Sequence, residues 1–127
     1  MPRPILDESQ IHPAIRAQVA THQQDIVREV VAACQQHAVV VVGMGMNPFC
    51  KKACQTLTQA GQAHQYLEYG NYFNTWRRRN ALKMWSGWST FPMVFVRGTL
   101  VGGYQEVKAL IGSGELAKLL ATPQRSA

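Results

Sequence analysis

The most constraining feature of this chain is the transition at residues 39–54, from an apolar run through a glycine-containing loop to a helix start. Val39–Val42 consists only of β-branched apolar residues, as expected of a strand that is covered on both faces. Two glycines follow in the loop, and Asn47-Pro48 then supplies a preferred N-cap and a preferred first helical residue. The sequence therefore predicts a buried strand that leads directly into a helix beginning near residue 47.

Cys50 falls in the first turn of this predicted helix, where a helix favours an anion. The first N–H groups of a helix have no intrahelical acceptor, and the macrodipole adds a partial positive charge there. Both effects lower the pKa of a thiol that solvent can reach. Cys50 is therefore a candidate reactive thiol, with the alternative that it is a small buried apolar side chain. Cys54 follows one turn later without a further ligand pair, so we expect no metal site.

Length and composition indicate one globular domain in a reducing compartment. With 127 residues, 46% of them apolar, the chain can form a single core without disulfides. Its first residues lack the apolar stretch of a signal peptide, and no apolar run reaches the length of a membrane span. Three cysteines, an odd number, argue against a secreted disulfide framework. We therefore expect a cytoplasmic protein with no membrane association.

The positive charge is concentrated in the C-terminal part of the chain. Residues 51–127 contain ten Lys and Arg against three Glu, a net charge of +7, whereas residues 1–50 carry −1. Such an excess attracts an anionic partner, for example a nucleic acid, an acidic protein or a small carboxylate. Arg77-Arg78-Arg79 lies near aromatic residues, but no nucleic-acid-binding motif accompanies it. We interpret this run as a solvated helix face and do not expect nucleic-acid binding.

The remaining patterns predict a small α/β domain that follows an extension. Residues 1–23 form the N-terminal extension, with a short helix at 14–20, and residues 121–127 form a tail. Within the domain, 24–120, we expect helices at 25–36, 47–60, 75–85, 104–111 and 115–120, and strands at 39–42, 65–69, 93–96 and 100–101. This order describes a small sheet with helices on both faces.

Four segments, in this order, resemble the glutaredoxin family. They are the helix start Pro48–Ala53, the pair Arg79–Lys83 and Trp85–Pro92, the strand and turn Met93–Gly98, and the diglycine Gly102-Gly103. The second of these segments is most similar to the monothiol branch of the family. The resemblance covers residues 24–120. It implies a thioredoxin-like fold with a four-stranded mixed sheet flanked by helices, and a cis peptide bond before Pro92.

One position limits what the resemblance implies about activity. Glutaredoxins use the first cysteine of a Cys-x-x-Cys or Cys-x-x-Ser motif to react with glutathione mixed disulfides or to ligate a shared [2Fe–2S] cluster. The residue aligned with that cysteine is Asn47, whose amide cannot form a thiolate. We therefore expect no iron–sulfur cluster. In the active-site loop Asn47, Pro48, Phe49, the following Cys50 is the only candidate for a catalytic thiol.

The resemblance also implies a glutathione-binding groove beside Asn47. Arg79 would pair with the glycyl carboxylate, the backbone of Phe91 would bind the extended peptide, and the helix start after Gly103 would hold the other carboxylate. The implied glutathione-binding residues are Arg79, Thr90, Phe91, Pro92, Gly103, Tyr104 and Gln105. Two of the family's polar residues are replaced, since its lysine before the motif aligns with Met44 and its acidic residue after the diglycine aligns with Gln105.

Two functions remain open from the sequence. The first is glutathione-linked thiol/disulfide redox, a form of electron transport, with Cys50 as the only active-site thiol. The second is a non-catalytic glutaredoxin-like module that binds a peptide or protein partner. Both interpretations predict the same kind of ligand, namely glutathione itself or a glutathionylated or acidic peptide or protein.

Overall fold

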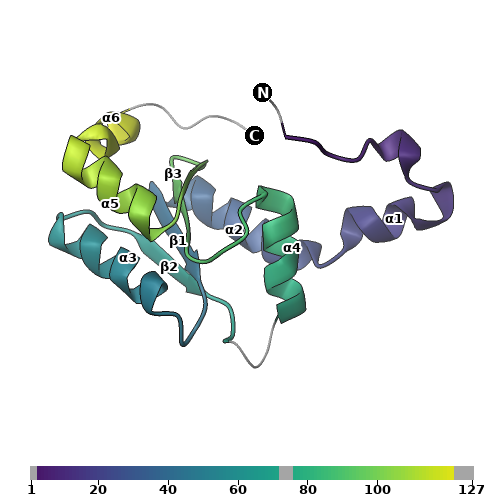
Figure 1. Cartoon of the computed structure of the whole chain (residues 1–127), viewed down its shortest axis with the longest axis horizontal. Coiled ribbons are helices and arrows are strands. Elements are labelled where there is room, and N and C mark those ends of the chain that lie inside the picture. The colour runs from purple at the N-terminus through teal and green to yellow at the C-terminus, as the bar shows by residue number, and fades with distance from the viewer. Residues whose placement is uncertain (1–2, 72–75, 122–127) are drawn as a thin grey trace.

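The structure, a computed structural model, describes residues 3–71 and 76–121 and is organised around one mixed β-sheet (Figure 1). The strands lie in the order β2-β1-β3-β4, with bounds Gln65–Glu68, Val39–Gly43, Met93–Val96 and Thr99–Gly102. β1 pairs in parallel with β2 and antiparallel with β3, and β3 pairs antiparallel with β4. This is the thioredoxin-like, four-stranded mixed sheet that the resemblance implies, so the predicted fold class is confirmed.

Helices cover both faces of the sheet. Their bounds are α1 Pro13–Thr21, α2 Gln24–Gln36, α3 Pro48–Gln59, α4 Trp76–Ser86, α5 Tyr104–Ser113 and α6 Glu115–Ala121, with a short 3-10 turn at Glu8–Gln10. α2 and α4 contact each other on one face, and α3 and α5 do so on the other, with α6 packed against α5 (Figure 1). α1 and the segment before it lie to one side of this layered body. Within residues 3–71 and 76–121, no helix has the length and apolar character needed to cross a membrane.

The side chains of β1 join two separate core clusters. Val40 and Val42 pack with apolar residues of α2 and α4, whereas Val39 and Val41 pack with apolar residues of α3, α5 and α6. Successive side chains of a strand point to opposite faces of its sheet. A central strand between two helical layers therefore needs an apolar residue at every position, which explains the unbroken valine run.

The predicted helices and strands are present, with bounds that differ by at most two residues. The start expected for α4 at residue 75 lies outside the described residues. The interpretation of Arg77-Arg78-Arg79 as a solvated helix face holds for Arg77, which is exposed, and is wrong for Arg79. Arg78 forms ion pairs of 3.0 Å with Asp25 and with Glu29 of α2. Arg79 is only 6% exposed, and its Nη1 donates a hydrogen bond of 3.1 Å to the carbonyl of Tyr69.

Candidate functional site

α3 begins at the N-cap that the sequence predicts. Asn47 Oδ1 accepts the N–H of Phe49 at 2.9 Å, and Pro48 is the first helical residue. Asn47 Nδ2 donates to the carbonyl of Phe91 at 3.3 Å, and the peptide bond between Phe91 and Pro92 is cis, as expected. An amide can make both contacts because it carries a donor and an acceptor. Asn47 therefore connects the start of α3 to the loop before β3.

Cys50 is buried beneath the start of α3. It is 1% exposed, and its sulfur lies 2.8 Å from the position that a Cβ atom would occupy at Gly43 of β1. Burial, the largest cause, raises the pKa of the Cys50 thiol, although hydrogen bonding to the backbone of Met44 acts in the opposite direction. This environment is that of a small apolar core side chain, the alternative that the sequence left open.

The other two cysteines also form no disulfide and lie in protected positions. Cys34 is buried on α2, and Cys54 is half-buried on α3. Burial raises the pKa of Cys34 and of Cys54 to about 11, so both are protonated at neutral pH. In the part of the chain that the structure describes, no three or more His, Cys, Asp or Glu side chains form a group that could hold a metal ion.

A cavity of about 500 Å³ lies beside Asn47, and we call it the groove. It is bounded by the start of α3, the loop before β3 and the start of α5. The groove brings together eight of the eleven residues that the sequence proposed for the site: Asn47, Phe49, Thr90, Phe91, Pro92, Gly103, Tyr104 and Gln105. Across its α3–α5 side, the rings of Phe49 and Tyr104 lie 6.2 Å apart between centroids.

The other three proposed residues do not line the groove. Cys50 is covered by α3, and Arg79 is held against the Tyr69 carbonyl in the interior. Pro48 lies on the opposite side of Asn47 and lines a second cavity. The structure thus separates the proposed peptide-binding residues, which come together, from the proposed thiol and the proposed arginine.

Lys83 is a groove residue that the sequence reasoning missed. It lines the groove, and its ammonium lies 5.7 Å from the centroid of the Phe91 ring. Lys83 follows Arg79 by four residues, so both side chains start from the same face of α4. This spacing was visible in the sequence and was the signal that could have identified Lys83 as the alternative cation. Met44, Trp88, Ser89 and Glu106 also line the groove.

The start of α5 offers hydrogen-bond donors to the groove, but one of them is already used. Glu106 Oε1 accepts the N–H of Gly103 at 2.8 Å and so caps the helix from within. The N–H groups of Tyr104 and Gln105 belong to the first turn, which has no intrahelical acceptors for them. These two groups, together with the side-chain amide of Gln105, can hold the carboxylate of a ligand.

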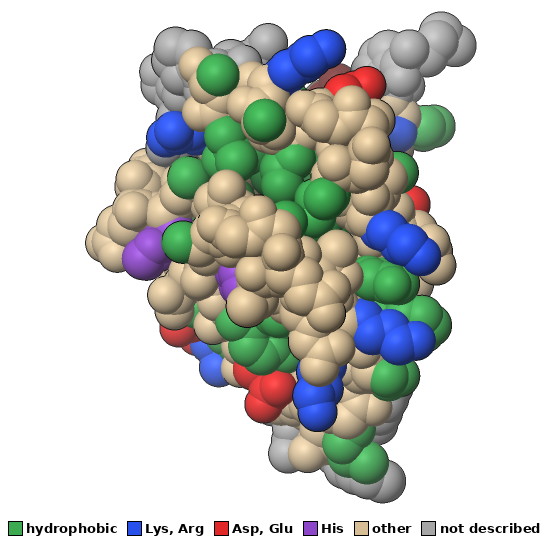
Figure 2. Space-filling view, turned by 90° about the vertical axis from the view of Figure 1, so that its left-hand side faces the viewer, with side chains coloured by type: hydrophobic (Ala, Val, Ile, Leu, Met, Phe, Trp, Pro, Cys, Tyr) green, Lys and Arg blue, Asp and Glu red, His purple; other side chains and the backbone are tan. Residues whose placement is uncertain are grey.

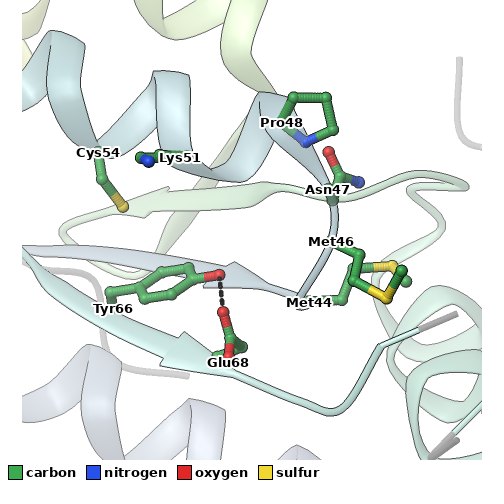
Figure 3. A pocket seen from close by; sticks show the side chains of 8 residues that line it. All are labelled: Met44, Met46, Asn47, Pro48, Lys51, Cys54, Tyr66 and Glu68. Carbon is green, nitrogen blue, oxygen red and sulfur yellow. Dashed lines mark hydrogen bonds between the residues drawn. The ribbon is translucent and has the colours of Figure 1, made fainter.

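The second cavity has a volume of about 470 Å³ and adjoins the groove (Figure 3). Its lining is mainly apolar and consists of Met44, Met46, Asn47, Pro48, Lys51, Cys54, Tyr66 and Glu68. Tyr66 donates a hydrogen bond of 3.1 Å to Glu68 on the β2 side of this cavity. Met44 and Asn47 line both cavities, so these two residues form the boundary between them.

The face that α3, α5 and α6 form carries several Lys and Arg side chains. Figure 2 views the molecule from the side of α3, α5 and α6, and Lys and Arg side chains follow the right-hand edge of this face. A positive surface of this kind raises the local concentration of anionic ligands.

Comparison with known proteins identifies the family to which the chain is similar. The family model described as glutaredoxin matches residues 39–101. A glutaredoxin-like protein of Dictyostelium discoideum is 39% identical over 98 residues, which cover 77% of this chain and 80% of that protein. Glutaredoxin-C1 of Arabidopsis thaliana is 32% identical over 93 residues, which cover 73% of this chain and 72% of that protein.

Solved structures agree with these sequence matches. The holo form of glutaredoxin C1 from Populus tremula x tremuloides superposes with a TM-score of 0.67 at 26% identity, over 84% of this chain and 99% of that one. A buckwheat glutaredoxin–glutathione complex, at 22% identity, shares the fold with a TM-score of 0.69 over 80% of this chain and 92% of that one. Because relatives above 30% identity match most of both sequences, the chain belongs to the glutaredoxin family.

Proposed function

We propose that this glutaredoxin-family protein binds glutathione, or a peptide of the same carboxylate chemistry, without exchanging disulfides through the position that the family uses. The observation that carries the proposal is a groove of about 500 Å³ whose wall at the start of α3 is the Asn47 amide. Disulfide exchange requires a thiolate that can attack a sulfur of the substrate. Asn47 cannot supply one, and the Cys50 thiol is buried with a raised pKa. Binding is the part of the family's function that these residues retain.

The donors around the groove support an extended ligand with a carboxylate at each end. Lys83 stands on the α4 side, and the N–H groups of Tyr104 and Gln105 stand at the start of α5. Between them, the backbone of Phe91 precedes β3 and can pair with a peptide as a strand edge does. Glutathione, with its two carboxylates and a peptide chain between them, matches this arrangement.

Lys83→Gln is expected to weaken glutathione binding by about three- to tenfold, because it removes a charged donor that is partly exposed. Isothermal titration calorimetry at low salt would measure the dissociation constant. Lys108→Gln is the matched control, since Lys108 is exposed on α5 and lines neither cavity. Equal affinities for the Lys83 and Lys108 variants would assign the carboxylate to another residue and leave Lys83 without a role in binding.

Cys50 is expected to remain unmodified when the folded protein is incubated with oxidised glutathione, because solvent does not reach its sulfur. Intact mass followed by peptide mapping would measure this. Cys54, which is half-buried, should react before Cys50 and Cys34, and all three should react in concentrated guanidinium chloride. A reducible adduct on Cys50 in folded protein would contradict the proposal and favour redox exchange through this thiol.

We also infer three features that accompany this function. The similarity of Trp85–Pro92 to the monothiol branch supports placing the protein beside that branch. The two core clusters draw their residues from α2 to α6, which supports residues 24–120 as the functional domain. The odd number of cysteines, none of which forms a disulfide, suits a cytoplasmic location. We expect no iron–sulfur cluster, because an amide stands where the family ligates iron.

A further inference from the structure

We propose that the second cavity receives the sulfur-linked substituent of an S-conjugated glutathione, that is, an apolar group attached through the glutathione thiol. The inference rests on the proposed binding of glutathione in the groove and names the class of ligand more closely. Its ligand would occupy both cavities at once, with the peptide in the groove and the substituent in the second cavity.

The position of Asn47 connects the two parts of such a ligand. A tripeptide held by its two end carboxylates places its central residue next to the backbone of Phe91. Asn47 Nδ2 is bonded to the Phe91 carbonyl, so the central side chain of the peptide lies beside Asn47. Asn47 and Met44 are also the residues at which the groove meets the second cavity. A group attached to the central sulfur would therefore start at the boundary of the second cavity.

The lining of the second cavity suits an apolar substituent. Two methionines, a proline and the ring of Tyr66 are among its lining residues, as Figure 3 shows. Methionine side chains are flexible and polarisable, so they adapt to groups of different shape. The polar hydroxyl of Tyr66 is already engaged by Glu68, which leaves its ring for contact with a ligand. Glutathione without a substituent would leave this space to water.

Met46 supplies a second, independent observation. It is 62% exposed, although it is a large apolar residue, and its backbone has a φ of 66°, in the left-handed region. The left-handed backbone of Met46 costs free energy in the unliganded protein, and residues held in this region cluster at ligand-binding sites. Contact with an apolar substituent would remove the Met46 side chain from water. A thioether has no S–S bond for a thiolate to break, so the conjugate would be bound without being altered.

The test compares the affinities of S-methylglutathione and S-hexylglutathione by isothermal titration calorimetry. Each buried methylene contributes about fourfold to affinity, so partial burial of the hexyl chain predicts binding at least about tenfold tighter. In Met46→Asn the ratio of the two affinities is expected to fall below about threefold, because the apolar contact is lost. Asparagine tolerates the left-handed backbone, so this variant should fold.

Met84→Asn is the matched control, because Met84 is 63% exposed and lines neither cavity. The ratio of the affinities for S-hexylglutathione and S-methylglutathione is expected to be the same in Met84→Asn as in the unaltered protein. Equal affinities for the methyl and hexyl compounds, or a ratio that falls as much in Met84→Asn as in Met46→Asn, would overturn the inference while leaving glutathione binding intact. If neither glutathione nor S-methylglutathione binds, the proposed function itself fails and this inference fails with it.

Discussion

Asn47→Cys is expected to give this protein glutathione-dependent disulfide reductase activity, which under the proposed function the unaltered chain does not have. We expect a rate on the order of 100-fold or more above the unaltered protein, because the substitution supplies a nucleophile for a covalent route. An NADPH-coupled assay with glutathione, glutathione reductase and hydroxyethyl disulfide would measure the rate.

The physical reason is that the surroundings of position 47 are already those of a reactive thiol. Asn47 is half-buried at the start of α3, whereas Cys50 is buried three residues later. A thiol at the N-cap lies next to the free N–H groups of the first turn, which stabilise the thiolate. Position 47 also lines the groove, so a sulfur there would meet a bound glutathione.

Two further variants separate the thiol from other effects of the substitution. Asn47→Ser keeps a side-chain cap for α3 without adding a thiol, and it should remain inactive. Cys50→Ala in the Asn47→Cys background should keep the new activity, since Cys50 takes no part in it. A folded but inactive Asn47→Cys protein would mean that the replacements at Met44 and Gln105 have removed the glutathione site, which contradicts the proposed function.

The fold could be predicted from the sequence because its determinants are local. The valine run of β1 and the cap at Asn47 depend on neighbouring residues, and each specifies a strand or a helix start by itself. The resemblance to glutaredoxins then supplied the four-stranded mixed sheet, which local patterns do not contain. The residues of the groove could be predicted in the same way, because Phe91, Gly103 and their neighbours belong to segments that resemble glutaredoxin segments in the same order.

The parts of the site that could not be predicted depend on contacts between distant residues. Whether Cys50 is exposed is decided by Gly43 and Tyr66, which lie on two different strands beneath α3. Whether Arg79 or Lys83 reaches the groove is decided by the Tyr69 carbonyl, which holds Arg79 in the interior. Sequence spacing places both cations on one helix face but does not show which of them turns inward.

Gly43→Ala is expected to lower the free energy of unfolding by about 1–3 kcal/mol, the usual cost of overfilling a packed site. A Cβ atom at this position would lie 2.8 Å from the sulfur of Cys50, 2.8 Å from Cε1 of Tyr66 and 2.9 Å from its hydroxyl oxygen. Urea unfolding followed by tryptophan fluorescence would measure the change. Gly112→Ala is the control, because its added Cβ would meet no described atom within 4 Å beyond its chain neighbours and the backbone of its own helix, and alanine is favoured over glycine in a helix.

The same substitution tests the burial of Cys50. If the sulfur fills the space beside Gly43, the double variant Gly43→Ala/Cys50→Ala should lose less free energy of unfolding than the two single variants lose together. A double-mutant cycle measures this coupling between the two positions. The destabilisation that remains in the double variant would reflect the displacement of Tyr66 toward the second cavity, which Tyr66 lines. A Gly43→Ala protein as stable as the parent, with no coupling to Cys50, would mean that the sulfur does not occupy this space. Cys50 would then be open to solvent at a helix N-terminus, and redox chemistry through this thiol would again be the better interpretation.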